Sequence, residues 1–177
     1  MKTKIYVLKI VLLALCVIGC SSDDDGNSGS GDIFGNIQLS GTDTSTVGSV
    51  LVVGNIDESA LSTTGTTSSV VLFDENTSIV GGELVSTDFT NGFVIVAAQF
   101  DSDDNAEVET AISMTIVKNS EEFSYVCTNP PSSGGDNTDC GTGFSVDKIA
   151  KKIVFDNTTV INVDSGAILT MDGIINY

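Results

Sequence analysis

Short apolar runs separated by Gly, Asn, Asp, Ser and Thr fill the chain from about residue 32 to its end. No stretch of this region keeps the 3.6-residue apolar stripe of an amphipathic helix. Runs such as Val70–Phe73, Phe93–Val96 and Lys152–Phe155 are rich in the β-branched and aromatic residues that favour strands. The pattern predicts strands over Ile33–Leu39, Val47–Ile56, Ser69–Phe73, Ser78–Val85, Gly92–Phe100, Thr110–Lys118, Glu122–Cys127, Gly143–Val146, Lys151–Phe155, Thr158–Val163 and Ala167–Asn176.

Many short strands at close spacing indicate an all-β fold. We expect a single antiparallel β-sandwich of about 8–11 strands, with a small β-barrel as the alternative. Asn91-Gly92 is the strongest hairpin signal in the chain, because both residues tolerate positive φ. Gly81-Gly82, Asp164–Gly166 and Asp172-Gly173 mark further turns or bulges. The predicted core residues are Val52, Val70, Leu72, Val94, Val96, Ile116, Ile153 and Ile168.

The first 19 residues have the pattern of a secretory signal peptide. Three lysines precede an uncharged run over Ile10–Ile18. A helix that spans the hydrocarbon core needs about 20 apolar residues, so this run is too short for a permanent anchor. A basic start, a short apolar run and small residues at its end are typical of a cleaved signal.

The residues at the end of this run carry a family resemblance. Val17-Ile18-Gly19-Cys20 resembles the lipobox of bacterial lipoproteins, and Ser21–Asp25 resembles the acidic tract of surface-exposed lipoproteins of Bacteroidota-type bacteria. The resemblance implies that Cys20 becomes the acylated first residue and that the lipid bilayer is a partner through it. It also implies an outer-membrane, lipid-anchored protein on the cell surface, with a periplasm-facing orientation as the alternative.

These segments divide the chain into a signal peptide (1–19), a lipidated cysteine with a flexible acidic and Gly/Ser tether (20–31) and a β-domain (32–177). After loss of the signal, four lysines remain against 24 acidic residues, so the net charge is 4 − 24 = −20. Such a chain repels phosphate backbones, which excludes nucleic acid as a partner. Binding to anionic membranes through charge is excluded for the same reason.

Cys127 and Cys140 are the cysteines left once Cys16 leaves with the signal and Cys20 is acylated. In an oxidising compartment such a pair predicts a disulfide. Zinc is the weaker alternative, because the chain has no histidine to complete four ligands. The polar loop over 128–139 is a candidate contact for a protein or glycan partner, and its alternative role is to clamp the end of a hairpin.

The acidic stretch from residue 101 to 109 is a weak candidate for a calcium site. Oxygen-bearing residues alternate along it, as a calcium loop requires: Asp101, Asp103, Asn105, Glu107 and Glu109. Ala106 stands where a glycine should allow the sharp turn, and Ile112 stands where a bidentate Glu should close the site. The alternative is an acidic hairpin tip that keeps the sheet soluble.

Candidate catalytic groups are few. The absence of histidine removes the imidazole base and the Ser-His-Asp triad. Ser145 and Lys148 match a Ser-x-x-Lys pattern, but the helix and the further motifs of that chemistry are missing. We therefore predict no catalytic residues, no cofactor beyond the calcium alternative, and a non-catalytic domain with a binding or structural role. A calcium-dependent adhesion module and a carboxylate-based surface hydrolase are the alternatives.

Overall fold

The computed structural model describes residues 33–59, 68–100, 109–131 and 137–177. In these ranges nearly every element is a strand, and the helix is a single turn, α2 (Thr44–Val47). The strands are β1 (Gly35–Gly41), β2 (Val50–Val53), β3 (Asn55–Asp57), β4 (Ser68–Phe73), β5 (Thr77–Val80), β6 (Glu83–Ser86), β7 (Asn91–Gln99), β8 (Thr110–Lys118), β9 (Glu121–Asn129), β10 (Ser145–Asp147), β11 (Lys152–Asn162) and β12 (Ile168–Asn176). The predicted all-β class is confirmed.

Ten strands form one antiparallel sheet. Its order is β2-β1-β12-β11-β9-β8-β7-β4-β3, and β10 pairs with one end of β11. The two outermost strands, β2 and β3, are joined through Gly54. The chain itself therefore links the two edges, and the sheet wraps into a nearly closed, flattened barrel.

The crossing at Gly54 depends on the missing side chain. Its N–H donates to the Phe73 carbonyl at 3.0 Å, which directs the chain from the β1 side of the sheet to the β4 side. A Cβ atom at this position would lie 2.5 Å from the Cα of Glu75. A residue with a side chain would push these two segments apart and open the edge.

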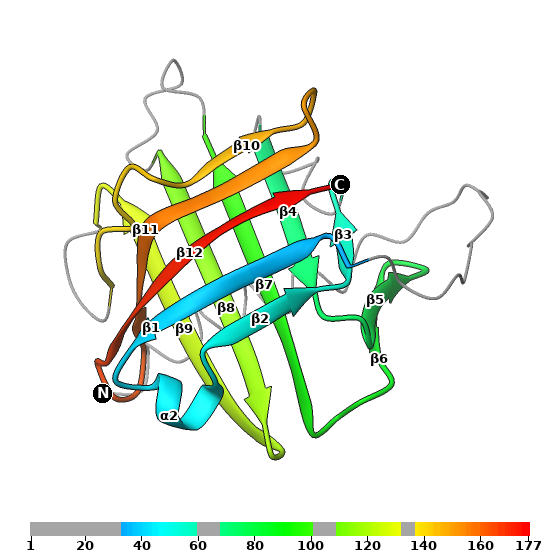
Figure 1. Cartoon of the computed structure of the whole chain (residues 1–177), viewed down its shortest axis with the longest axis horizontal. Coiled ribbons are helices and arrows are strands. Elements are labelled where there is room, and N and C mark those ends of the chain that lie inside the picture. Colours follow the sequence, from blue (N-terminus) through cyan, green and yellow to red (C-terminus); the bar gives the residue numbers. More distant parts are fainter. Residues whose placement is uncertain (1–32, 60–67, 101–108, 132–136) are drawn as a thin grey trace.

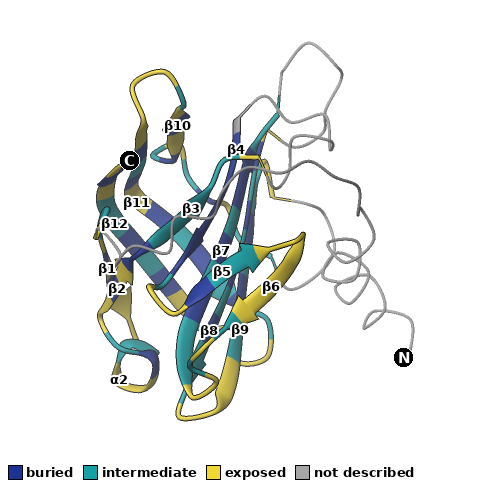
Figure 2. Ribbon diagram, turned by 90° about the vertical axis from the view of Figure 1, so that its right-hand side faces the viewer, coloured by how far each residue is buried: buried dark blue, intermediate teal, exposed yellow. Residues whose placement is uncertain are grey.

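One layer of the flattened barrel contains β2, β1, β12 and β11, and its strands cross those of β9, β8, β7 and β4 behind them (Figure 1). The core lies between the layers, as the dark blue inner faces in Figure 2 show. Strand side chains alternate between faces. The core includes Ile37, Ile95, Ile112, Met114, Ile153, Leu169, Met171 and Ile175, all nearly inaccessible to solvent.

The predicted Asn91-Gly92 hairpin is wrong. Both residues lie in β7, paired with Lys118 and Val117 of β8. The Asp88 carboxylate accepts hydrogen bonds from the Thr90 and Asn91 N–H groups and so shapes the entry to β7. The tight turn lies instead between β8 and β9, where Asn119 and Ser120 have φ of 53° and 68°.

Four predicted strands are divided differently in the structure. The run over Ser78–Val85 becomes β5 and β6, separated by a turn at Gly81-Gly82. The run over Val47–Ile56 becomes the end of α2 followed by β2 and β3. The runs over Lys151–Phe155 and Thr158–Val163 are one strand, β11, with a bulge between Phe155 and Thr158. Asp172-Gly173 lies within β12 beside this bulge, and Asp164–Gly166 forms the turn that precedes β12.

Four predicted core residues are buried, namely Val70, Leu72, Ile116 and Ile153. Val52 and Ile168 were predicted wrongly and are 41% and 47% exposed, because Leu51, Val53 and Leu169 take the inward positions. Val94 and Val96 are only half-buried, since they alternate with the inward Phe93, Ile95 and Ala97. Because side chains alternate along a strand, a shift of one residue in the predicted inward positions exchanges the buried and exposed faces of the whole strand.

Candidate functional site

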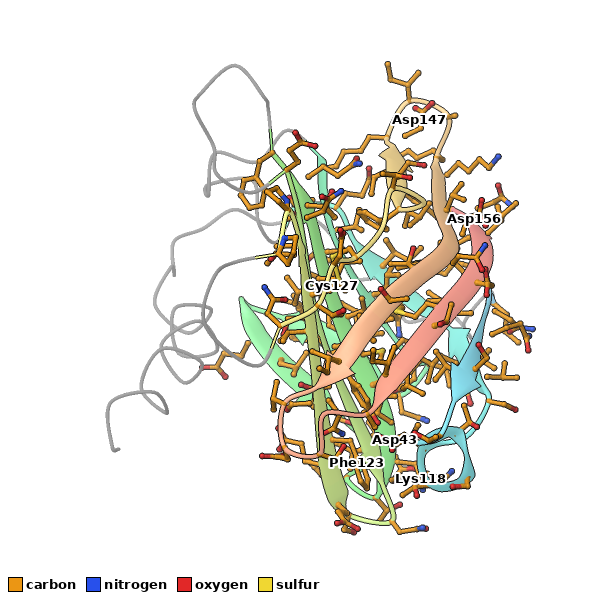
Figure 3. All side chains as sticks on the ribbon, turned by 90° about the vertical axis from the view of Figure 1, so that its left-hand side faces the viewer. Asp43, Lys118, Phe123, Cys127, Asp147 and Asp156 are labelled. Atoms are coloured by element: carbon orange, nitrogen blue, oxygen red, sulfur yellow. A yellow bond between two sulfur atoms is a disulfide. The ribbon has the colours of Figure 1, made fainter. Side chains whose placement is uncertain are left out.

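A half-open cavity of about 210 Å³ lies at the end of the barrel where α2 packs. Its lining residues come from three segments far apart in the sequence: Asp43, Thr46, Glu121, Glu122, Phe123, Asn162, Asp164 and Ser165. Asp43 and Phe123 lie at the α2 end in Figure 3, and Asp147 lies at the opposite end. We call this the α2-end cavity.

Asp43 is tied to the core below the cavity. Its Oδ2 atom accepts hydrogen bonds from the Tyr125 hydroxyl at 3.0 Å and from Asn162 Nδ2 at 3.3 Å. Asn162 Oδ1 in turn accepts from the N–H groups of Asp164 and Ser165. Buried polar groups need such partners, so the wall of the cavity is fixed by side chains that satisfy one another.

Tyr125 is fully buried at this point. Burial raises the pKa of its phenol to about 12, and the Asp43 carboxylate adds to the rise while Asn162 opposes it. The phenol therefore stays protonated at neutral pH and acts as a hydrogen-bond donor. The Oδ2 atom of Asp43 accepts the hydrogen bond from this hydroxyl.

The rim of the α2-end cavity is acidic. Glu121, Glu122 and Asp164 join Asp43 there, and Lys118 is the strand partner of Glu121 at the β8–β9 turn. The surface favours cationic groups and hydrogen-bond donors over anions. Within the described ranges, no three His, Cys, Asp or Glu side chains converge closely enough to hold a metal ion.

A second polar cluster lies at the other end of the fold. Glu58 forms an ion pair with Lys151 and accepts a hydrogen bond from the Tyr177 hydroxyl at 3.2 Å. Lys148 Nζ donates to the Glu58 carbonyl at 2.9 Å. The Lys151 ammonium also stands 5.0 Å from the centre of the Tyr177 ring. These contacts hold the end of β3 against the β10–β11 turn and the C-terminus.

The electrostatics of this cluster are consistent with a structural role. The hydrogen bond from Lys151 holds the pKa of the Glu58 carboxyl below its usual value. Burial and the Glu58 carboxylate raise the pKa of Tyr177 to about 12. Ser145 lies in strand β10 and Lys148 in the turn after it, so the local pattern is the strand and turn expected from the sequence.

The predicted disulfide between Cys127 and Cys140 is present. Both cysteines are buried in the core cluster. The base of the loop that they close is also hydrogen-bonded, since the Thr128 N–H donates to the Thr138 carbonyl and the Cys140 N–H to that of Thr128. The bond therefore joins the end of β9 to the segment that leads into β10.

Other predicted site residues lie outside the described residues: Cys20, Asp101, Asp103, Asn105 and Glu107. Glu109 is described, and its carbonyl accepts from the Phe100 N–H at 2.9 Å. Phe100 and Glu109, the described residues on either side of positions 101–108, therefore lie together at the paired ends of β7 and β8.

Sequence reasoning missed the residues of the α2-end cavity. Asp43 is separated by 82 residues from Tyr125 and by 119 from Asn162. No short motif spans such distances, and each residue alone is an ordinary polar position. The one local signal was the turn predicted at Asp164–Gly166, and it did not indicate which distant residues the turn would contact.

No described helix is long and apolar enough to cross a bilayer. Comparison with protein-family models, with curated proteins and with solved structures gives no match to this chain.

Proposed function

We propose that this protein is a lipid-anchored, non-catalytic binding or structural domain of the outer membrane, exposed on the cell surface. The observation that carries the proposal is the lipobox-like Val17–Cys20, followed after a short tether by the start of a β-fold. Two or three acyl chains on Cys20 would anchor the domain stably, since each buried methylene contributes about 0.8 kcal/mol.

The α2-end cavity supports a binding role rather than a catalytic one. Asp43 already accepts two hydrogen bonds, and the buried Tyr125 hydroxyl is used as the donor of one of them. A general base must instead be free to take a proton near the working pH.

Replacement of Cys20 by Ser tests the anchor. We expect Cys20→Ser to lose palmitate incorporation and to leave the outer-membrane fraction. Cys16→Ser is the matched control, because Cys16 lies in the expected signal peptide and should be dispensable for both. Retention of Cys20→Ser in the outer-membrane fraction would refute the lipid anchor.

Protease added to intact cells tests the surface orientation. The proposal predicts that the β-domain is cut from cells that produce the native chain. Protection of the domain until the outer membrane is opened would instead indicate the periplasm-facing orientation.

A calcium-dependent binding module is the second candidate. The hydrogen bond between Phe100 and Glu109 at the ends of β7 and β8 supports it, because these two residues flank positions 101–108 in the sequence. A ligand that binds only the folded state at 100 times its Kd stabilises the fold by about 2.7 kcal/mol. If millimolar calcium leaves the melting temperature unchanged, this alternative is wrong.

A further inference from the structure

The β5–β6 hairpin exposes an unusual amount of apolar surface. Val80, Leu84 and Val85 on the two strands are 61%, 57% and 43% exposed, and Phe89 on the segment that follows is 80% exposed. β5 and β6 pair with each other in a separate two-stranded sheet that projects from the barrel (Figure 2). We call residues 77–89 the apolar hairpin. The register of the two strands puts Val80 and Val85 on one face of the hairpin and Leu84 on the other, so both faces expose apolar side chains. Exposed apolar side chains gathered on one projecting element mark a candidate interaction surface.

Charge also sets the apolar hairpin apart from the rest of the molecule. The chain carries 24 acidic residues, yet Asn76–Gly82 contains none. Glu83 and Asp88 are the charges of the apolar hairpin, and the Asp88 carboxylate is occupied by the Thr90 hydroxyl and backbone N–H groups. Glu83 follows the Gly81-Gly82 turn directly and is exposed, so its carboxylate can stay in water while the apolar side chains enter a region of lower polarity.

The apolar hairpin starts next to the point where the N-terminal tether joins the fold. The Phe34 N–H donates to the Val53 carbonyl at 2.9 Å. Gly54, the next residue, lies directly against Glu75, two residues before β5. The Asn55 side chain then donates to the Thr77 carbonyl at 2.9 Å. Ile33, the first described residue, directly precedes Phe34 and is 63% exposed.

The length of the tether limits how far this region lies from an acylated Cys20. Thirteen peptide units separate residues 20 and 33. A flexible Gly/Ser-rich segment of that length has a root-mean-square span of about 20 Å, and full extension reaches about 45 Å. The apolar hairpin is therefore kept near the bilayer, where even a weak contact forms at a high effective concentration.

We propose that the apolar hairpin docks on the surface of the bilayer that holds Cys20, with Val80, Leu84, Val85 and Phe89 in the interfacial region. This inference rests on the proposed lipid anchor. Docking would fix the orientation of the domain, which attachment through Cys20 alone would leave free. It uses apolar contact, because the charge of the domain opposes attraction to anionic headgroups.

The test uses the full lipidated protein in phosphatidylcholine vesicles that contain nitroxide-labelled lipid. An environment-sensitive fluorescent amino acid replaces Glu83 on the apolar hairpin or, as a matched control, Ser45 on α2; both positions are exposed. We expect the label at residue 83 to be quenched several-fold more than the label at residue 45. The double change Leu84→Ser and Phe89→Ser should abolish that difference while the protein still floats with the vesicles, and an unchanged melting temperature would show that the barrel remains folded.

The outcomes separate the two proposals. If the protein does not float with the vesicles, the proposed lipid anchor is wrong, and the docking proposal, which depends on it, is wrong as well. If the protein floats but the two labels are quenched equally, the docking alone is overturned. The docking would also be overturned if, in detergent, the label at residue 83 became more shielded as the protein concentration increased. A second copy of the chain would then cover the apolar hairpin.

Discussion

Tyr125 shows how one buried polar side chain connects distant parts of this chain. Its ring is fully buried in the core cluster, and its hydroxyl reaches Asp43 just before α2. Asn162 of β11 donates to the same carboxylate oxygen. The three residues hold α2, β9 and β11 together and form one wall of the α2-end cavity.

Replacement of Tyr125 by Phe should change the alkaline stability of the protein. The folded pKa of about 12 lies above the ordinary value of 10, so this contribution is full below pH 10 and is lost as the pH rises towards 12. We expect Tyr125→Phe to cost about 1 kcal/mol at pH 7 through the lost hydrogen bond and to flatten the decline above pH 10. Urea unfolding at pH 7, 10 and 11 measures both effects, and an unchanged alkaline slope would contradict the assignment.

The β8–β9 hairpin depends on backbone conformation more than on its side chains. Asn119 and Ser120 both have positive φ, as a two-residue hairpin turn requires. Asn tolerates this conformation well, whereas Ser lacks both the freedom of glycine and the propensity of Asn. Asn91-Gly92, the strongest local hairpin signal, lies within β7 instead, where Gly92 packs against Asp74. A Cβ atom at residue 92 would stand 2.6 Å from the Asp74 carboxylate, and this carboxylate also accepts a hydrogen bond from the Phe93 N–H.

Ser120→Gly should therefore stabilise the protein by about 0.5–1 kcal/mol in urea unfolding, because it relieves the backbone strain of positive φ at residue 120. The same change at Ser165 is the matched control. That residue is not among those with positive φ, and its hydroxyl accepts the Ala167 N–H, so Ser165→Gly should be neutral or destabilising. Equal effects at the two positions would refute the explanation.

The barrel is one ten-stranded sheet wrapped around one core, and it is joined at three places. Gly54 connects its outer strands, the Glu58 cluster holds β3 against the β10–β11 turn and the C-terminus, and the disulfide joins β9 to the segment before β10. Of these three connections, the disulfide is a covalent cross-link between side chains. In the chain-entropy model a loop of this size stabilises a fold by about 3 kcal/mol.

Reduction of the disulfide should lower the free energy of unfolding by about 2–4 kcal/mol. The control is the double variant Cys127→Ser and Cys140→Ser, which should start at the lower stability and be insensitive to reductant. If thiol titration shows complete reduction of the native chain while its stability is unchanged, the stabilising role is wrong.

The sequence by itself determined the class of the fold, the approximate position of most strands and the pairing of Cys127 with Cys140. These features depend on local composition and on the small number of free cysteines, and both can be read without knowledge of the packing. It also carries the lipobox-like pattern on which the proposed anchor depends.

Only the tertiary structure decided which side of each strand faces the core, and which polar residues meet. Val52 and Leu51 are both apolar, so only the pairing of β2 with β1 places Leu51 inward. The same holds for Ile168 and Leu169 on β12. The α2-end cavity and the position of the apolar hairpin beside the tether arise from contacts between residues far apart in the sequence, and such contacts leave no local pattern.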